Sequence, residues 1–300
     1  MQGLLLLNKP KGITSFGAVS RIKRIANEKR VGHTGTLDPD ATGVLPILLG
    51  RATALSSLML DADKRYIATV KLGITTDTDD ISGNIISQKN VSVTSEDLSS
   101  ALEHFTGKIT QTPPIYSAIK KDGVRLYKLA REGKTAEIPS REVEIFEIKL
   151  LNALDENNEF IIETHVSKGT YIRSLARDIG EYLGCGATLT KLSRTASSGF
   201  LSEDCVGLDA LSEENIGKYI LSEEKAVEHL PVIEVTEKQA VRFTNGGQLS
   251  FERLKQGEFI NNALYRVRYD NLLLGIGVAD CESEQIAIKC IINYPKGERK

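Results

Sequence analysis

The sequence GHTGTLDPDATGVLP, which spans residues 32–46, carries the strongest local signal in this chain of 300 residues. It sets Asp38 among three glycines and directly before Pro39, with Pro46 at the exit. The glycines allow backbone conformations that a side chain would forbid, and a proline keeps the residue before it out of the helical region. Such a loop suits a site that must hold one carboxylate still. The same residue types also form ordinary surface turns, and composition alone favours that simpler interpretation.

Four further segments strengthen the functional interpretation. In chain order they are NKPKGITS (8–15), YIATVKLG (66–73), TPPIYSA (112–118) and SKGTYIRSL (167–175). Together with the Asp38 loop, they closely resemble the TruB family of bacterial tRNA pseudouridine synthases, which modify uridine 55 in the T-arm. The resemblance runs from about Leu4 to Arg194 and continues more loosely to the C-terminus. Five matches in sequence order are far more specific than any one of them.

Length and composition are those of a folded protein of about two domains. Apolar residues make up 41% of the chain, which is enough for a sizeable core. No run of roughly 18 apolar residues is present, and the cluster Leu4–Leu7 is only of strand length, so we expect a cytoplasmic protein with no membrane span. The four cysteines and four histidines form no recognisable ligand cluster, so neither disulfides nor a metal site are expected.

The net charge of −2 hides opposite local charges. Residues 1–30 hold seven Lys or Arg against one acid, and residues 118–134 hold six against two. Residues 201–230 hold eight acids against two bases. Each basic run alone would be an ordinary solvated face, but two of them on either side of the Asp38 loop favour an anionic polymer as the partner.

Periodicity predicts an α+β fold around a largely antiparallel mixed sheet. Three segments have the length and pattern of strands: residues 4–7, 66–72 and 160–166. Ser15 is placed to cap a helix that runs to about Ala26. Thr170 is placed to cap a second helix, which Gly184 ends. Strands and helices do not alternate regularly, which favours α+β over a doubly wound fold.

The chain changes character near its last quarter. Residues 202–228 are acidic and helix-permissive, and we place the transition between a catalytic domain (1–228) and a second domain (229–300) there. Four short strand candidates then follow, at residues 232–235, 263–269, 272–278 and 285–292. They predict a small β-barrel-like module, and the resemblance implies a PUA-like RNA-binding domain.

The reaction that the resemblance implies breaks the N-glycosidic bond of uridine, turns the captive uracil and joins its C5 to the ribose. It needs an ionised carboxylate, a flat contact for the loose base and exclusion of water, but no cofactor or metal. The resemblance assigns the carboxylate to Asp38, and attack on a carbon and assistance as a base both stay open. It assigns Arg173 as the cation that keeps Asp38 charged. It assigns Tyr66 as the residue that stacks on the base, and the Tyr66 hydroxyl can also receive the C5 proton.

Other residues are implied on the substrate side. A uridine in a folded loop must leave its stack to reach a buried carboxylate, which costs a few kcal/mol. By resemblance, His33 takes up position against the RNA once the base has left. Lys9 and Pro10 belong to the substrate-side first motif, and Leu192 to the apolar wall of the uracil pocket. Taken singly, each of these residues has an ordinary structural explanation.

Residues 107–134 resemble the thumb insertion of the same family. They combine Gly107 and two prolines with interleaved tyrosines and basic residues, a composition that suits a mobile clamp on a phosphate backbone. We therefore expect Lys120, Lys121 and Arg125 to bind RNA. The expected partner is the T-arm of tRNA, bound by a monomer that needs no other protein.

Two other functions stay open at this point. DPDAT at residues 38–42 matches the Asp-x-Asp-x-Thr signature of magnesium-dependent phosphohydrolases, with Asp79 and Asp80 as further ligands. Those enzymes carry the motif at the end of a buried parallel strand, whereas Gly, His and Thr precede it here. The other is a non-catalytic tRNA-binding or RNA-folding factor, although binding alone would not need Asp38, Tyr66 and Arg173 together.

Overall fold

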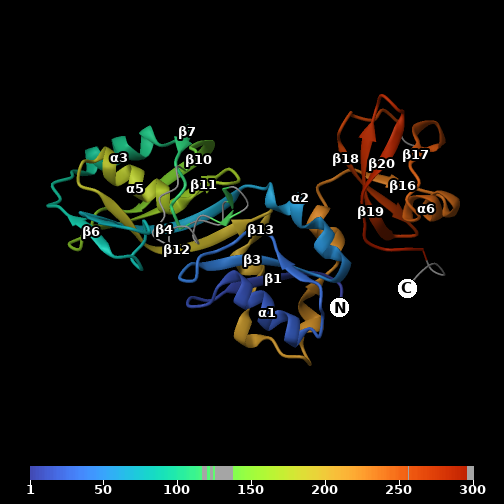
Figure 1. The fold of residues 1–300 in the computed structure, drawn as a ribbon, viewed down its shortest axis with the longest axis horizontal. Coiled ribbons are helices and arrows are strands. Elements are labelled where there is room, and N and C mark those ends of the chain that lie inside the picture. The colour runs from blue at the N-terminus through green and yellow to red at the C-terminus, as the bar shows by residue number, and fades with distance from the viewer. Residues whose placement is uncertain (117–119, 122–123, 126–137, 256, 296–300) are drawn as a thin grey trace.

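The computed structural model describes residues 1–116, 120–121, 124–125, 138–255 and 257–295, and a large mixed sheet forms its body (Figure 1). The main path of this 11-stranded sheet runs in the order β14 (Val206–Gly207), β1 (Gly3–Lys9), β3 (Thr42–Leu49), β12 (Ala187–Ser197), β4 (Lys64–Leu72), β11 (Glu159–Val166), β10 (Arg141–Asn152) and β7 (Gly107–Gln111). Neighbours are antiparallel, except that β14 is parallel to β1 and β12 is parallel to β3. The predicted α+β fold with a largely antiparallel sheet is confirmed.

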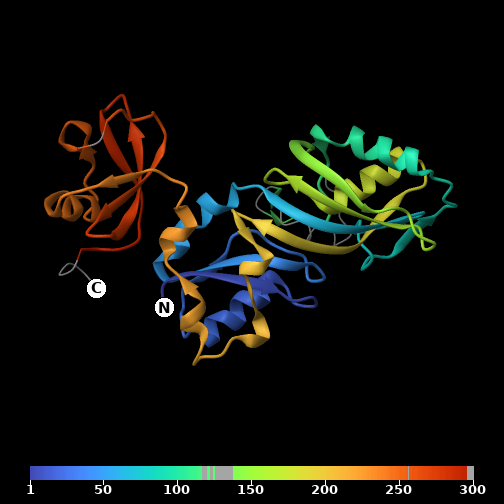
Figure 2. The same cartoon turned by 180° about the vertical axis from the view of Figure 1, so that it is seen from behind.

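Shorter elements complete the body. Three small strands extend the sheet: β2 (Val31–His33), β13 (Phe200–Leu201) and β15 (Ile220–Leu221). Two hairpins lie outside it: β5 (Ile74–Thr76) with β6 (Ile85–Gln88), and β8 (Lys120–Lys121) with β9 (Val124–Arg125). The helices in the described part of the body are α1 (Ser15–Ile25), α2 (Ser56–Leu60), α3 (Ser95–His104) and α5 (Ile172–Tyr182). Helix α1 lies beside β1 and β3, while α3 and α5 cover the other end of the sheet (Figures 1 and 2).

Two helix starts differ from the prediction by one residue. Thr14, not Ser15, caps α1, because its side chain accepts the backbone N–H of Gly17. Helix α5 follows Tyr171 with no side-chain cap, and the hydroxyl of Thr170 instead donates to Ser167 O. Both predicted caps were wrong because the hydroxyls bond elsewhere: that of Ser15 bonds the distant backbone of Leu37, and that of Thr170 bonds Ser167, three residues before it. Gly184 does end α5, in the left-handed conformation at φ +77°.

The C-terminal module is a five-stranded sheet, in which four strands were predicted and the fifth, β17, was not. Its order is β16 (Val232–Glu234), β18 (Leu264–Tyr269), β19 (Leu272–Asp280), β20 (Gln285–Ile291) and β17 (Leu249–Ser250). One helix, α6 (Glu237–Thr244), was not predicted. It begins with a capping box in which the side chain of Thr236 accepts from Gln239 N and the side chain of Gln239 accepts from Thr236 N. The Thr-x-x-Gln spacing could have revealed this helix.

The run Leu4–Leu7 is apolar throughout because both faces of β1 are buried. Leu5 and Leu7 join the main core beneath α1. Leu4 and Leu6 join a second cluster that also contains Leu273, Ile276 and Ile292 of the C-terminal module. Polar contacts cross the same boundary: the amide nitrogen of Gln2 donates to the side-chain oxygen of Asn293 (2.7 Å), and Arg266 pairs with Glu224 (2.8 Å).

The acidic stretch between the two sheets forms no α-helix. Residues 202–228 contain the 3₁₀ turns Ser202–Asp204, Leu208–Ala210, Ile216–Tyr219 and Glu223–Val227. Between these turns, β14 and β15 each add two residues to β1. Two further 3₁₀ turns lie at Gly50–Leu55 and Phe251–Arg253. Within the described ranges, none of the helices is long and apolar enough to cross a membrane.

A candidate active site around Asp38

Asp38 lies on the loop between β2 and β3, and buried polar contacts fix this loop. The ammonium of Lys9, which is fully buried, donates to the carbonyls of Pro10 (2.8 Å), Ile13 (2.7 Å) and Pro39 (3.1 Å). The hydroxyl of Ser15 accepts from Leu37 N (2.8 Å) and donates to Leu37 O (3.0 Å). Lys9 and Ser15 therefore hold the backbone on both sides of Asp38.

Glycine is required where β3 meets β12. Gly43 adopts φ +102°, and a Cβ atom there would lie 2.2 Å from the carbonyl oxygen of Arg194. No side chain fits this close approach of two backbones, so the loop that carries Asp38 can join β3 only through glycine.

Arg173, in the first turn of α5, forms an ion pair with the carboxylate of Asp38. Its Nε lies 3.0 Å from Oδ2 and its Nη2 lies 3.3 Å from Oδ1. The same guanidinium donates to the carbonyls of Thr78 (3.1 Å) and Tyr116 (3.0 Å) and lies 3.6 Å from a carboxylate oxygen of Asp80. Arg173 is only 5% exposed, whereas the side chain of Asp38 remains 41% exposed. The carboxylate is thus fixed from behind and open in front.

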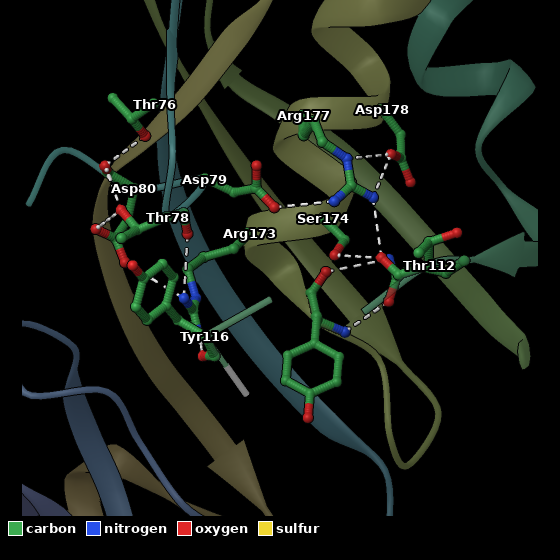
Figure 3. A network of polar contacts seen from close by, with 12 residues as sticks. Thr76, Thr78, Asp79, Asp80, Thr112, Tyr116, Arg173, Ser174, Arg177 and Asp178 are labelled. Carbon is green, nitrogen blue, oxygen red and sulfur yellow. Dashed lines mark hydrogen bonds and ion pairs between the residues drawn. The ribbon is translucent and has the colours of Figure 1, made fainter. Parts of the chain in front are cut away.

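Figure 3 shows that a second arginine of α5 extends this network. Arg177 follows Arg173 by four residues and so lies on the same face of the helix. It pairs with Asp79 (2.9 Å) and Asp178 (2.8 Å) and donates to Thr112 O (2.9 Å). Two arginines therefore tie the segments around Asp79 and Thr112 to α5, and the first of them reaches Asp38.

A cavity of about 330 Å³ opens in front of Asp38. Tyr66 of β4 lines it and is 7% exposed. Tyr66 stands opposite Arg194 of β12 in the antiparallel ladder, and Leu192, two residues before Arg194, lines the same cavity. Tyr116 and Tyr171 also contribute to its walls. A carboxylate, flat rings and an apolar wall thus surround one space.

The electrostatics of the loop follow from burial. Desolvation raises the pKa of Asp38 above its ordinary value, and the charge of Arg173 acts against this rise. Asp80, a like charge, adds to the rise, and Lys9 opposes it. Desolvation also lowers the pKa of Lys9 to about 8, although the charges of Asp38 and Asp40 favour its protonated form.

The structure brings some of the predicted site residues together and places others elsewhere. Asp38, Tyr66, Arg173 and Leu192 line one cavity. Lys9 lies beneath the loop, and the Pro10 carbonyl accepts from it, so in this conformation they support the loop rather than line the cavity.

The remaining predicted site residues are His33 and three basic residues of the thumb. His33 ends β2, and its buried Nδ1 has no hydrogen-bond partner among the described residues. Desolvation, followed by the charge of Arg194, lowers the pKa of His33. Lys120, Lys121 and Arg125 belong to the hairpin of β8 and β9, and their side chains lie outside the described part of the structure.

Several residues of the site were not predicted. Lys64, Arg194, Tyr116 and Tyr171 line the cavity, although the last two lie in the quoted segments. Arg173 and Arg177 could have been recognised in the sequence, because a spacing of four residues places both on one face of a helix.

The geometry removes support from the phosphohydrolase alternative. The loop joins antiparallel strands, and Arg173 lies between the carboxylates of Asp38 and Asp80 instead of leaving them open to a cation. In the described ranges, no group of three or more His, Cys, Asp or Glu side chains is arranged to hold a metal ion.

Comparisons with known proteins agree with the resemblance found in the sequence. Residues 23–172 match the model of the TruB family pseudouridylate synthase N-terminal domain, and residues 173–230 match that of the tRNA pseudouridylate synthase B C-terminal domain. The tRNA pseudouridine synthase B of Clostridium perfringens is 40% identical over 282 residues, which cover 93% of this chain and 96% of the relative. That of Bacillus cereus is 41% identical over 274 residues, with coverage of 88% and 86%.

Solved structures show the same fold. A chain of an H/ACA RNP bound to a substrate RNA containing 2′-deoxyuridine matches with a TM-score of 0.73 and 26% identity, covering 98% of this chain and 87% of that one. A chain of a Cbf5-Nop10-Gar1 complex matches with a TM-score of 0.72 and 28% identity, covering 98% and 84%. The chain therefore belongs to the TruB family of pseudouridylate synthases.

Proposed function

We propose that this protein isomerises uridine 55 in the T-arm of tRNA to pseudouridine, with Asp38 as the essential carboxylate. The observation that carries the proposal is the convergence of Asp38, Tyr66, Arg173 and Leu192, from four separate parts of the chain, on one cavity. The relatives named tRNA pseudouridine synthase B support tRNA as the substrate class.

In the proposed reaction, the target uridine leaves its stack and enters the cavity, where Tyr66 offers its ring to the base. The bond between N1 and C1′ breaks, the uracil turns, and a bond between C5 and C1′ forms. A proton is lost from C5 and N1 ends protonated, so atoms balance without a cofactor. Asp38 acts either on a carbon or as a base, and both routes require its ionised form, which Arg173 favours.

Other residues take supporting roles. Lys9 and Pro10 position the Asp38 loop, because Lys9 is buried and donates to three backbone carbonyls. His33 occupies the place that the target base leaves in the RNA. Lys120, Lys121 and Arg125 contact the RNA backbone from the thumb, residues 107–134.

The proposed function has a direct test. Purified protein and an unmodified tRNA transcript are incubated with EDTA and without any nucleotide, and pseudouridine is mapped at single-residue resolution. We expect stoichiometric conversion at position 55, because none of the proposed steps uses a metal or a cofactor. Complete loss of activity that magnesium restores, with the tRNA shown to stay folded in EDTA, would contradict the metal-independent reaction. Conversion at another position would contradict the assignment to uridine 55.

We also propose that residues 1–228 form the catalytic domain and residues 229–300 a PUA-like RNA-binding domain, in a cytoplasmic monomer that needs no protein partner. Ending the chain near Glu228 should lower tRNA affinity, because an RNA-binding surface is lost. It should also lower the melting temperature, because Leu6 and Leu48 lose the part of their apolar cluster that Leu273 and Ile276 supply. Filter binding and calorimetry measure the two effects. A truncated protein that melts and binds tRNA like the parent would contradict the proposed roles of this module.

A further inference from the structure

Two buried cations, Lys64 and Arg194, stand side by side on the wall of the cavity. A Cβ atom at Gly35 would lie 3.4 Å from Nη1 of Arg194 and 4.0 Å from Cε of Lys64, so both side chains flank the same point. Lys64 is 8% exposed and Arg194 is 1% exposed, yet both line the cavity in front of Asp38.

Neither cation has an anionic partner in the described part of the chain. Arg194 donates from Nε to Val44 O (2.7 Å) and from Nη2 to Gly35 O (3.1 Å), and Nη1 donates to no described residue. Lys64 donates to the carbonyls of Leu60 and Ala62, which leaves one of its three N–H groups available. This pair differs from Arg173, which two carboxylates surround.

The nearby carboxylates are engaged elsewhere. Asp61 pairs with Lys168 (3.0 Å), and Asp63 pairs with His165. Desolvation, followed by the charge of Arg194, lowers the pKa of Lys64 to about 8, while Asp63 and Asp61 oppose this effect. Two like charges held together at low exposure are unfavourable in the free protein, and an anion bound between them would relieve the repulsion.

We propose that Lys64 and Arg194 form a phosphate subsite, which binds a backbone phosphate next to the flipped nucleotide. The inference rests on the proposed function and deepens it. Tyr66 stands opposite Arg194 in the β-ladder, so a nucleotide whose base contacts Tyr66 brings its own phosphates close to this pair. A guanidinium and an ammonium with free donors match phosphate oxygens, and phosphate contacts fix the position of a nucleic acid.

The experiment pairs a change in the protein with a change in the RNA. T-arm stem-loops carry a single uncharged methylphosphonate either 5′ or 3′ of the target uridine. They are compared with the unmodified RNA on the parent, on Lys64→Gln and on the control Lys168→Gln. Lys168 is exposed and outside the cavity, although it lies in the electrostatic neighbourhood of Lys64. Filter binding gives Kd, and single-turnover kinetics give the half-saturating concentration and the maximal rate.

We expect Lys64→Gln and one of the two methylphosphonates each to weaken binding roughly tenfold or more, as for loss of a charged hydrogen bond. Together they should weaken binding no further than either one alone. Lys168→Gln should have a small effect that adds to that of the methylphosphonate.

The proposal would be overturned if the loss of affinity from Lys64→Gln added to the loss from the methylphosphonate at both linkages. Lys64 would then contact the base or support the fold instead of a phosphate. Parent protein that binds both methylphosphonate RNAs like the unmodified RNA would also overturn it, without any variant. Lys64→Met, which keeps the apolar stem, replaces Lys64→Gln if circular dichroism shows that the latter does not fold. Conversion of the unmodified RNA by the parent is scored separately, so a failed subsite and a failed function give different results.

Discussion

Asp38→Asn should fold and bind tRNA nearly as the parent does, while its rate of pseudouridine formation falls by roughly 10⁴-fold or more. Asparagine keeps the shape of aspartate, and Arg173 can still donate to its side-chain oxygen. The charge is lost, however, and both proposed roles of Asp38 depend on that charge. Circular dichroism, filter binding and product mapping under single-turnover conditions separate fold, binding and chemistry.

Asp40→Asn is the matched control, two residues along the same loop. Asp40 is exposed, and its carboxylate makes no ion pair or hydrogen bond within the described residues. The phosphohydrolase alternative needs both aspartates, whereas the proposed isomerisation needs only the first. Asp40→Asn should therefore retain near-parental turnover. If Asp38→Asn kept near-parental turnover with fold and binding intact, its catalytic assignment would be wrong.

Local patterns were enough to predict much of the fold. The alternation at residues 66–72 fell within β4, and the four strand candidates after Pro231 overlap β16, β18, β19 and β20. Glycine and proline spacing marked the Asp38 loop as constrained, and the closeness of Gly43 to Arg194 gives the physical reason. These features are local, since side-chain periodicity and backbone conformation depend on near neighbours in the chain.

Contacts between distant segments could not be predicted in the same way. Lys9 lies in a basic run that suggested RNA binding, but the fold buries it under Pro39, 30 residues away. Asp79 and Asp80 suggested metal ligands, whereas α5 supplies arginines to both. Charge alone does not show which partner a side chain meets, because that depends on how the sheet brings loops together.

The pH dependence of catalysis should reveal how Arg173 and Asp80 oppose each other at Asp38. The reaction needs ionised Asp38, so its rate should fall as the pH drops through the pKa of this carboxyl. Desolvation raises that pKa above its ordinary value, Arg173 lowers it and Asp80 raises it. Removing the cation should therefore move the acid limb of the profile to higher pH, and removing the like charge should move it to lower pH.

Arg173→Lys and Arg173→Gln separate the position of this cation from its charge. Lysine keeps one positive charge but has only three N–H donors on one nitrogen, so it cannot replace the two contacts to Asp38 and the bonds to Thr78 O and Tyr116 O together, and the carboxylate loses its fixed position. We expect the maximal single-turnover rate at neutral pH to fall by about 10²-fold or more, as for a misplaced catalytic group. Arg173→Gln should in addition shift the acid limb to higher pH, because it removes the charge that lowers the pKa of Asp38.

Asp80→Asn is the opposing variant. Its carboxylate lies 3.6 Å from Arg173 and accepts from the hydroxyl of Thr78 and the backbone of Ser82, contacts whose shape asparagine largely retains. Rates measured from about pH 4.5 to 8.5 should show its acid limb at lower pH than that of the parent, while the acid limb of Arg173→Gln lies at higher pH. A merely structural role for these residues would lower the rate without moving the limb. Shifts in the same direction for Arg173→Gln and Asp80→Asn would contradict the view that Asp38 is the titrating group, because their charges act on it with opposite sign.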